Sequence, residues 1–185
     1  ASDVYKRQRL DGAKGGRLVS LDQDPDAVQT ARARLAGLPA TVVQINFRYA
    51  GQALESLGIE KINGALLDLG VSSHQLDDAA RGFSYRADAP LDMRMDQRNA
   101  LSAYEVVNDY SEENLSRILH EYGEERFARK IAHNICVSRQ KAQIRKTGEL
   151  IEIIKRSIPA KIRATGGHPA KRTFQAVSYT HLTLP

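Results

Sequence analysis

The stretch LLDLGVSSHQLDDAARGFSYRADAPLDMRMD, from Leu66 to Asp96, decides the fold class of this chain. Its apolar start is typical of a buried strand, which we expect over Ile62–Leu69. Asp68 stands near the end of that strand, and Gly70 lets the following backbone approach a ligand closely. Open parallel sheets present their chemistry in such loops, at the carboxyl edge. The stretch therefore predicts an α/β protein with a functional edge at Asp68.

The residues before this stretch complete the α/β pattern. Strands are predicted over Arg17–Asp22 and Thr41–Ile45, and a short helix over 52–57. Between the strands we expect a helix that begins after Asp24 and runs to about Leu35, because aspartate caps helices and the following proline is tolerated at the first helical position. Strands and helices that alternate through short connections indicate a parallel sheet covered on both sides.

Beyond Arg98 the pattern becomes helical. Ser102 and Glu105 have the spacing of a capping box. Amphipathic helices are predicted over 112–122 and 125–139, and a further one from about residue 147 to a point before Pro159. This succession of helices indicates a small helical subdomain inserted into the sheet domain.

These elements suggest five segments. We expect a partial sheet core over 12–98, a helical insertion over 99–165 and a return to the core over 166–177. Residues 1–11 and 178–185 show neither a periodic pattern nor a cap, and we expect them to be non-native or disordered tails. The α/β part also lacks the first strand that its sheet needs, so we expect a fragment.

Composition narrows the function classes. The net charge is +5, from 27 basic and 22 acidic residues. No acidic residue follows Glu152, so the excess positive charge lies at the end of the chain. Such a charge distribution favours binding to a phosphate backbone. A solvated basic face that binds nothing has the same pattern. We define the basic stretch as the six cations of that region, which we predict to bind RNA: Lys155, Arg156, Lys161, Arg163, Lys171 and Arg172.

Other compositional features argue against metal, disulfide and membrane classes. Cys136 is the single cysteine, which rules out an internal disulfide. The five histidines lack the spacing of metal ligands, so we expect no metal site. No apolar run approaches about 18 residues and no signal-like start is visible, so we expect a cytoplasmic protein without a membrane partner.

Three side chains near predicted strand ends are candidates for ligand contacts. Asp22 lies where a carboxylate accepts hydrogen bonds from a ribose, or where it caps a helix, a role for which Asp24 competes. Phe47 suits stacking on a purine, although a core phenylalanine gives the same pattern. Asp68 can hold an amine and take up positive charge as the amine attacks a carbon electrophile, or it can close a turn. The carboxylates of LDMRMD are a catalytic pair or surface ion pairs.

Three long strings resemble one bacterial family. They are the stretch quoted first, YGEERFARKIA (Tyr122–Ala132) and HPAKRTFQAV (His168–Val177). They are similar to the S-adenosylmethionine-dependent methyltransferases that modify the exocyclic N4 amine of a cytosine in small-subunit ribosomal RNA. The likeness covers roughly residues 12–177. It implies a class I methyltransferase (Rossmann-like) fold with a helical insertion, S-adenosylmethionine as cofactor, and ribosomal RNA or the 30S subunit as partner.

The resemblance also implies roles for single residues. Asp22 falls on the ribose-side acid of the family, Phe47 on its adenine-side aromatic, and Asp68 and Gln75 on two further cofactor-contacting positions. We also predict that Asp68 lies near the reacting amine. The glycine-rich Gly-Gly-His loop and the later strands of the family are missing here. We therefore expect an incomplete sheet and a chain that is inactive alone.

Two other function classes stay open. A nicotinamide-dependent oxidoreductase also binds ribose through an acid at the end of that strand. A non-enzymatic RNA-binding or ribosome-binding module needs only the basic stretch. Binding of S-adenosylmethionine by a completed chain separates these classes.

Overall fold

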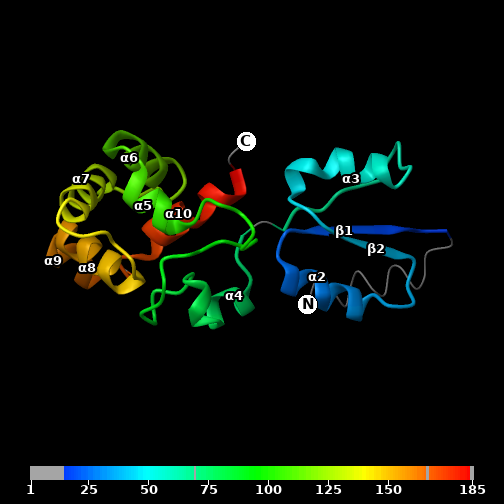
Figure 1. Cartoon of the computed structure of the whole chain (residues 1–185), viewed down its shortest axis with the longest axis horizontal. Helices are drawn as coiled ribbons and strands as arrows, with labels where there is room; N and C mark the ends of the chain where they lie inside the picture. Colours follow the sequence, from blue (N-terminus) through cyan, green and yellow to red (C-terminus); the bar gives the residue numbers. More distant parts are fainter. Residues whose placement is uncertain (1–14, 69, 166, 184–185) are drawn as a thin grey trace. The chain divides into compact units, whose positions relative to one another are not determined.

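The computed structural model describes residues 15–68, 70–165 and 167–183 (Figure 1). The chain divides into two compact units, Ala1–Leu67 and Asp68–Pro185. The first is an α/β unit and the second is helical. The predicted α/β class is therefore confirmed at this level, while the segment limits predicted at residues 98, 165 and 177 remain predictions about domain organisation.

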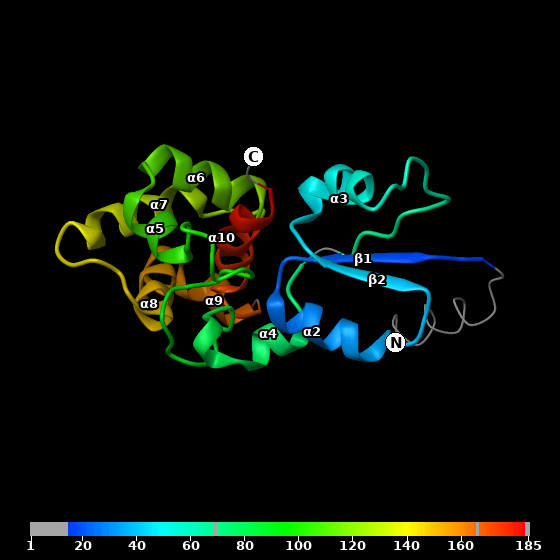
Figure 2. The same cartoon turned by 45° about the vertical axis from the view of Figure 1, so that its right-hand side comes forward.

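The first unit is built on a two-stranded parallel sheet. Strands β1 (Leu18–Asp22) and β2 (Ala40–Gln44) pair in a register that sets Asp22 beside Gln44. Helix α2 (Pro25–Arg34) connects them and packs against both. The 3-10 helix η1 (Phe47–Tyr49) and α3 (Ala50–Ser56) follow β2. Two views show α2 and α3 on opposite sides of the sheet, as predicted for a covered parallel sheet (Figures 1 and 2).

The strand predicted over Ile62–Leu69 is wrong for residues 62–68, which lie outside any strand; Leu69 lies outside the described residues. The side chains of Leu66 and Leu67 are 73% and 62% exposed. The prediction assumed a neighbouring strand, since a strand is stable only where its backbone groups find partners. Within the described residues the sheet contains only β1 and β2, so the apolar segment is left unpaired.

The second unit begins with short elements and continues as packed helices. Its elements are α4 (Ser73–Asp77), the 3-10 helix η2 (Ala79–Arg81), α5 (Ala103–Asp109), α6 (Glu112–Glu121), α7 (Ala128–Arg139), α8 (Thr147–Ser157), α9 (Ala160–Thr165) and α10 (Lys171–Thr183). The predicted helices after residue 98 are confirmed within a few residues. The Ser102–Glu105 capping box is present at the start of α5.

The core of this unit lies between α5, α6, α7, α8 and α10. Helix α7 packs against α5, α6 and α8, and α10 packs against α5 and α6. The largest fully buried apolar side chains are Met93, Val106, Val107, Leu115, Ile118, Leu119, Ile131, Ile135, Leu150, Ile154 and Val177. The C-terminal region therefore packs on the helical unit, and residues 178–183, which we expected in a tail, continue α10.

Gly123 allows α6 and α10 to approach closely. A Cβ atom at this position would lie 2.5 Å from the carbonyl oxygen of Arg172 and 3.0 Å from the Cβ of Ala176, both on α10. Real Cβ atoms do not approach a carbonyl oxygen so closely, and a larger residue would force the helices apart. This packing role of Gly123 is a finding of the structure.

Candidate functional site

Asp22 and Phe47 lie at the same edge of the sheet. Asp22 is the last residue of β1 and is in register with Gln44, the last residue of β2. Phe47 follows three residues later, where β2 has passed into η1, and its side chain is half-buried. Because β1 and β2 are parallel, both residues belong to the carboxyl edge, where open α/β sheets bind ligands.

The cap of α2 is Asp24 and not Asp22. The Asp24 carboxylate is buried and accepts the backbone N–H of Asp26 at 3.0 Å. Asp22 accepts the N–H of Asp24 at 2.9 Å through Oδ1, and its side chain is exposed. The capping alternative for Asp22 is therefore wrong, and a carboxylate at the sheet edge remains accessible to a ligand.

The environment of Asp22 disfavours its charge. Desolvation at the strand end raises the pKa of the carboxyl group above its ordinary value, and repulsion from Asp24 adds to this, while the N–H groups of Asp24 and Gln23 oppose it. A carboxylate held at an accessible edge against a desolvation cost is typical of a functional position.

Gln23 and Asn46 form a polar link between the two strand ends that the sequence analysis missed. The amide of Asn46 donates to Gln23 Oε1 at 2.8 Å, and Asn46 Oδ1 accepts the N–H of Arg48 at 3.0 Å. These bonds hold the turn that carries Phe47. The signal was available, because Asn46 directly follows the predicted second strand, the same placement that singled out Asp22.

Asp68 and Gln75 belong to the second unit. Asp68 is exposed and lies in neither helix nor strand. Gln75 is buried at the start of α4, where its Oε1 accepts the N–H of Ser72 at 2.8 Å and its N–H donates to the Ser72 hydroxyl at 3.2 Å. This pair is a capping box, so Gln75 has a structural role. The cofactor contacts that the resemblance implies for Asp68 and Gln75 remain predictions.

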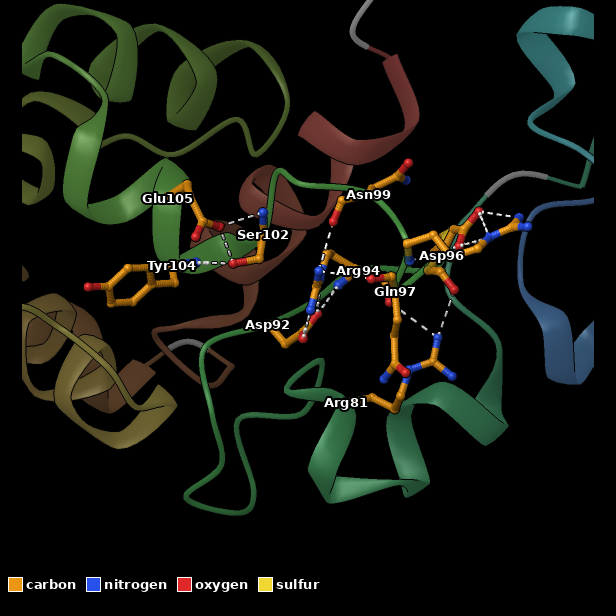
Figure 3. Close-up of polar contacts among 11 residues, drawn as sticks. Arg81, Asp92, Arg94, Asp96, Gln97, Asn99, Ser102, Tyr104 and Glu105 are labelled. Carbon is orange, nitrogen blue, oxygen red and sulfur yellow. Dashed lines mark hydrogen bonds and ion pairs between the residues drawn. The ribbon is translucent and has the colours of Figure 1, made fainter.

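The loop between η2 and α5 is braced by arginines (Figure 3). The buried Arg81 donates to the carbonyl oxygens of Arg94 and Met95 at 3.2 and 3.0 Å. Arg94 forms an ion pair with Asp92 at 2.8 Å and donates to the carbonyl of Asn99 at 2.7 Å. This segment is therefore an ordered scaffold.

The acidic residues of LDMRMD form ion pairs. Besides the Asp92–Arg94 pair, Asp96 lies 2.7 Å from Arg98, and that pair lowers the pKa of the Asp96 carboxyl group. The structure thus favours the ion-pair alternative for these carboxylates. An open hollow of about 480 Å³ lies beside the loop and is lined by Pro90, Leu91, Asp92, Ser102, Tyr104, Glu105 and Arg145.

The basic stretch spreads over three helices. Lys155 and Arg156 lie on α8, Lys161 and Arg163 on α9, and Lys171 and Arg172 on α10; Lys155 is half-buried and the others are exposed.

Three of these cations gather around one carboxylate. Lys155 forms an ion pair with Glu152 at 2.8 Å, and the charges of Arg156 and Arg163 also help to lower the pKa of Glu152. Arg172 instead donates to the carbonyl of Glu124 at 2.7 Å, beside the close approach of α6 and α10. A structural role for Arg172 therefore accompanies its predicted RNA contact.

Comparison with known proteins identifies relatives along most of the chain. The model of the MraW methylase family matches residues 4–180. Ribosomal RNA small subunit methyltransferase H 2 of Agathobacter rectalis is 58% identical over 165 residues, which cover 88% of this chain and 52% of that protein.

Two further relatives are named ribosomal RNA small subunit methyltransferase H. The Brevibacillus brevis protein is 54% identical over 166 residues, which cover 89% of this chain and 53% of the relative. The Lachnospira eligens protein is 54% identical over 172 residues, covering 92% and 54%. The chain spans about half the length of the curated relatives that it matches.

Proposed function

The chain belongs to the MraW methylase family, and from this premise we propose that it forms part of an enzyme that methylates the N4 amine of a cytosine in small-subunit ribosomal RNA, with S-adenosylmethionine as cofactor. The fold that we propose is the class I methyltransferase sheet, of which β1 and β2 are neighbouring strands. The observation that carries the proposal is the placement of Asp22 and Phe47 at one sheet edge. Asp24 caps α2, so the Asp22 carboxylate is not used as the helix cap.

These two residues fit the nucleoside part of the cofactor. Asp22 uses Oδ1 for a backbone N–H and is exposed, so it has acceptor capacity for ribose hydroxyls. Phe47 offers a half-buried ring for stacking on adenine. The cofactor, when bound, supplies a methyl group activated by a sulfonium charge. From the resemblance of their sequence strings, we propose that Asp68 and Gln75 also contact the cofactor.

The chemical difficulty lies in the cytosine amine, whose lone pair is delocalised into the ring. An exposed carboxylate such as Asp68 accepts a hydrogen bond from this amine and stabilises positive charge as it forms on the nitrogen. Holding the amine in line and supplying this acceptor lower the barrier by several kcal/mol in comparable systems. In this proposal Asp68 is the residue next to the reacting nitrogen.

The RNA is held by the loop over 81–96 and by the basic stretch. The loop is rigid enough to position a base, because Arg81 and Arg94 tie it to its own carbonyl groups. The target base must leave its stack, which costs a few kcal/mol. Cations that neutralise phosphates offset this cost.

We propose that this enzyme works in the cytoplasm. No described helix has the length and apolar character that a bilayer span requires.

The cofactor site is tested with a completed protein, in which the flanking regions of the Agathobacter rectalis relative are joined to this chain. Asp22→Asn is expected to weaken S-adenosylmethionine binding at least tenfold in calorimetry, because a ribose acceptor loses its charge. Asp26→Asn, on the exposed first turn of α2, removes the same charge and leaves affinity unchanged. Equal affinities for the two variants, or no binding by the completed protein, would contradict the proposal.

The RNA contact is tested by salt dependence. Lys171→Ala is expected to weaken binding of small-subunit ribosomal RNA and to reduce the slope of log affinity against log salt by about 1. Lys141→Ala removes an exposed lysine outside the basic stretch and serves as the matched control. If the Lys171 and Lys141 variants behave alike, or if Lys171→Ala together with Arg172→Ala leaves affinity and slope unchanged, this part is wrong.

A further inference from the structure

His168 takes part in an aromatic stack on the helical unit. Its ring lies 4.2 Å from that of Tyr85, centroid to centroid, and the two planes differ by only 8°. Phe174, on α10, meets Tyr85 edge-on at 6.0 Å and 83°. Phe174 is buried and Tyr85 is half-buried, whereas His168 is exposed. The stack therefore runs from the core to the surface and ends in an imidazole.

The orientation of this imidazole is fixed on two sides. Tyr85 covers one face, and Nδ1 accepts the backbone N–H of Ala170 at 3.2 Å, in the turn that leads into α10. A neutral imidazole that accepts at Nδ1 carries its proton on Nε2. The pKa of His168 is lowered, first by desolvation and then by the charge of Lys155, and this favours the neutral ring.

His168 is exposed, and Tyr85 covers one face of its ring. The other face and the outer edge are therefore the parts of the ring that a stacking partner would meet. A flat, neutral, immobilised aromatic surface loses little conformational entropy when a second ring stacks on it. The same ring has no charge to desolvate, which further lowers the cost of binding.

The surroundings of His168 carry positive charge. Lys155 is close enough to shift its titration, and Arg156 and Arg163 share Glu152 with Lys155. Lys171 lies three residues beyond His168, at the start of α10. An aromatic face beside several cations is the arrangement by which proteins bind single-stranded nucleic acid, with bases stacked on rings and phosphates near lysine and arginine.

We propose that the outward face of His168, backed by Tyr85, is a stacking platform for an unpaired base of the RNA. The inference rests on the proposed function, since it names how the RNA of that reaction is gripped. It goes beyond the basic stretch because cations alone bind any polyanion, whereas a ring selects an unstacked base. An acidic protein segment would use the same cations and leave the ring without a role.

The test uses this 185-residue chain and a short single-stranded RNA that contains 2-aminopurine, whose fluorescence is quenched by stacking. No S-adenosylmethionine is present, so a failure of methyl transfer or cofactor binding leaves the result unaffected. His168→Ala is expected to weaken binding about tenfold and to abolish part of the quenching, in the range seen when one stacked base loses its partner. His168→Phe keeps a ring and is expected to bind within about threefold of the parent chain.

Lys171→Ala is the electrostatic control, expected to weaken binding while bound RNA stays quenched. Circular dichroism confirms that each variant is folded. Parent-level binding and quenching by His168→Ala overturn the proposal, as does a parent chain that binds no RNA. An acidic peptide is also tested as a competitor of the RNA. If it displaces RNA equally from the parent and His168→Ala chains, and both chains bind RNA with the same affinity, the proposal is overturned and a protein partner is indicated instead.

Discussion

Replacing Thr147 by valine is expected to loosen the loop over 81–96. Thr147 is fully buried at the start of α8. Its hydroxyl accepts the N–H of Ala89 at 3.0 Å and donates to the carbonyl of Ala87 at 2.9 Å. Valine has nearly the same shape, so the change removes two hydrogen bonds without opening a cavity. Each bond contributes about 1 kcal/mol, and a buried N–H without a partner costs a further 1–3 kcal/mol. We expect the free energy of unfolding to fall by about 3–5 kcal/mol.

Thr173→Val is the matched control for this prediction. Thr173 is also fully buried, on α10, but its hydroxyl has no hydrogen-bond partner among the described residues. Its replacement is expected to leave stability unchanged or to raise it by up to about 1 kcal/mol, since an unsatisfied polar group is removed. Urea denaturation followed by circular dichroism gives both values. If the two variants lose equal stability, the loop is not held by the Thr147 hydroxyl.

Three further predictions concern packing and titration. Gly123→Ala is expected to destabilise the helical unit by about 1–3 kcal/mol in the same assay, because the new methyl group meets the backbone of α10. Gly167→Ala is the control and should leave stability unchanged, because a Cβ atom at that position meets no atom within 4 Å. Because the pKa of Asp22 is raised, ionisation of its carboxyl group lowers the free energy of unfolding of the parent chain as pH rises through that pKa. The Asp22→Asn side chain does not ionise, so this variant should gain stability relative to the parent chain between about pH 3 and pH 7. A parent chain that gains stability relative to Asp22→Asn over this range would refute the sign. Because the pKa of His168 is lowered, the contribution of its neutral ring to stability is present at neutral pH and is lost as pH falls below about 6.5. The midpoint of its NMR titration should lie below that of an ordinary histidine. In Tyr85→Ala this midpoint should move upward, and an unchanged midpoint would show that Tyr85 contributes nothing to the desolvation of the ring.

Local signals accounted for much of the structure. Asp24 and the proline after it determine where α2 begins, and Ser102 with Glu105 determines where α5 begins, because a cap is satisfied within a few residues. The placement of Asp22 and Phe47 at one edge also followed from local strand and helix patterns. Such features depend little on the rest of the chain.

The parts that sequence reasoning missed depend on distant partners. Leu66 and Leu67 have a strand-like pattern, but a strand also needs a neighbour, and none pairs with them in the described residues. The His168–Tyr85 stack joins positions far apart in the sequence, so the sequence around either residue does not predict it. Periodicity reports burial and does not report which partner provides it.

The anchoring of the loop at α8 has a consequence for the order of folding. Contacts between Ala87 or Ala89 and Thr147, and between Asp88 and Gly148, join residues about 60 positions apart. During synthesis, which adds about 5–20 residues per second, the loop emerges seconds before the threonine that holds it. Its shape is therefore acquired late, once α8 has left the ribosome, and a nascent chain arrested before residue 147 should present these backbone groups to proteases.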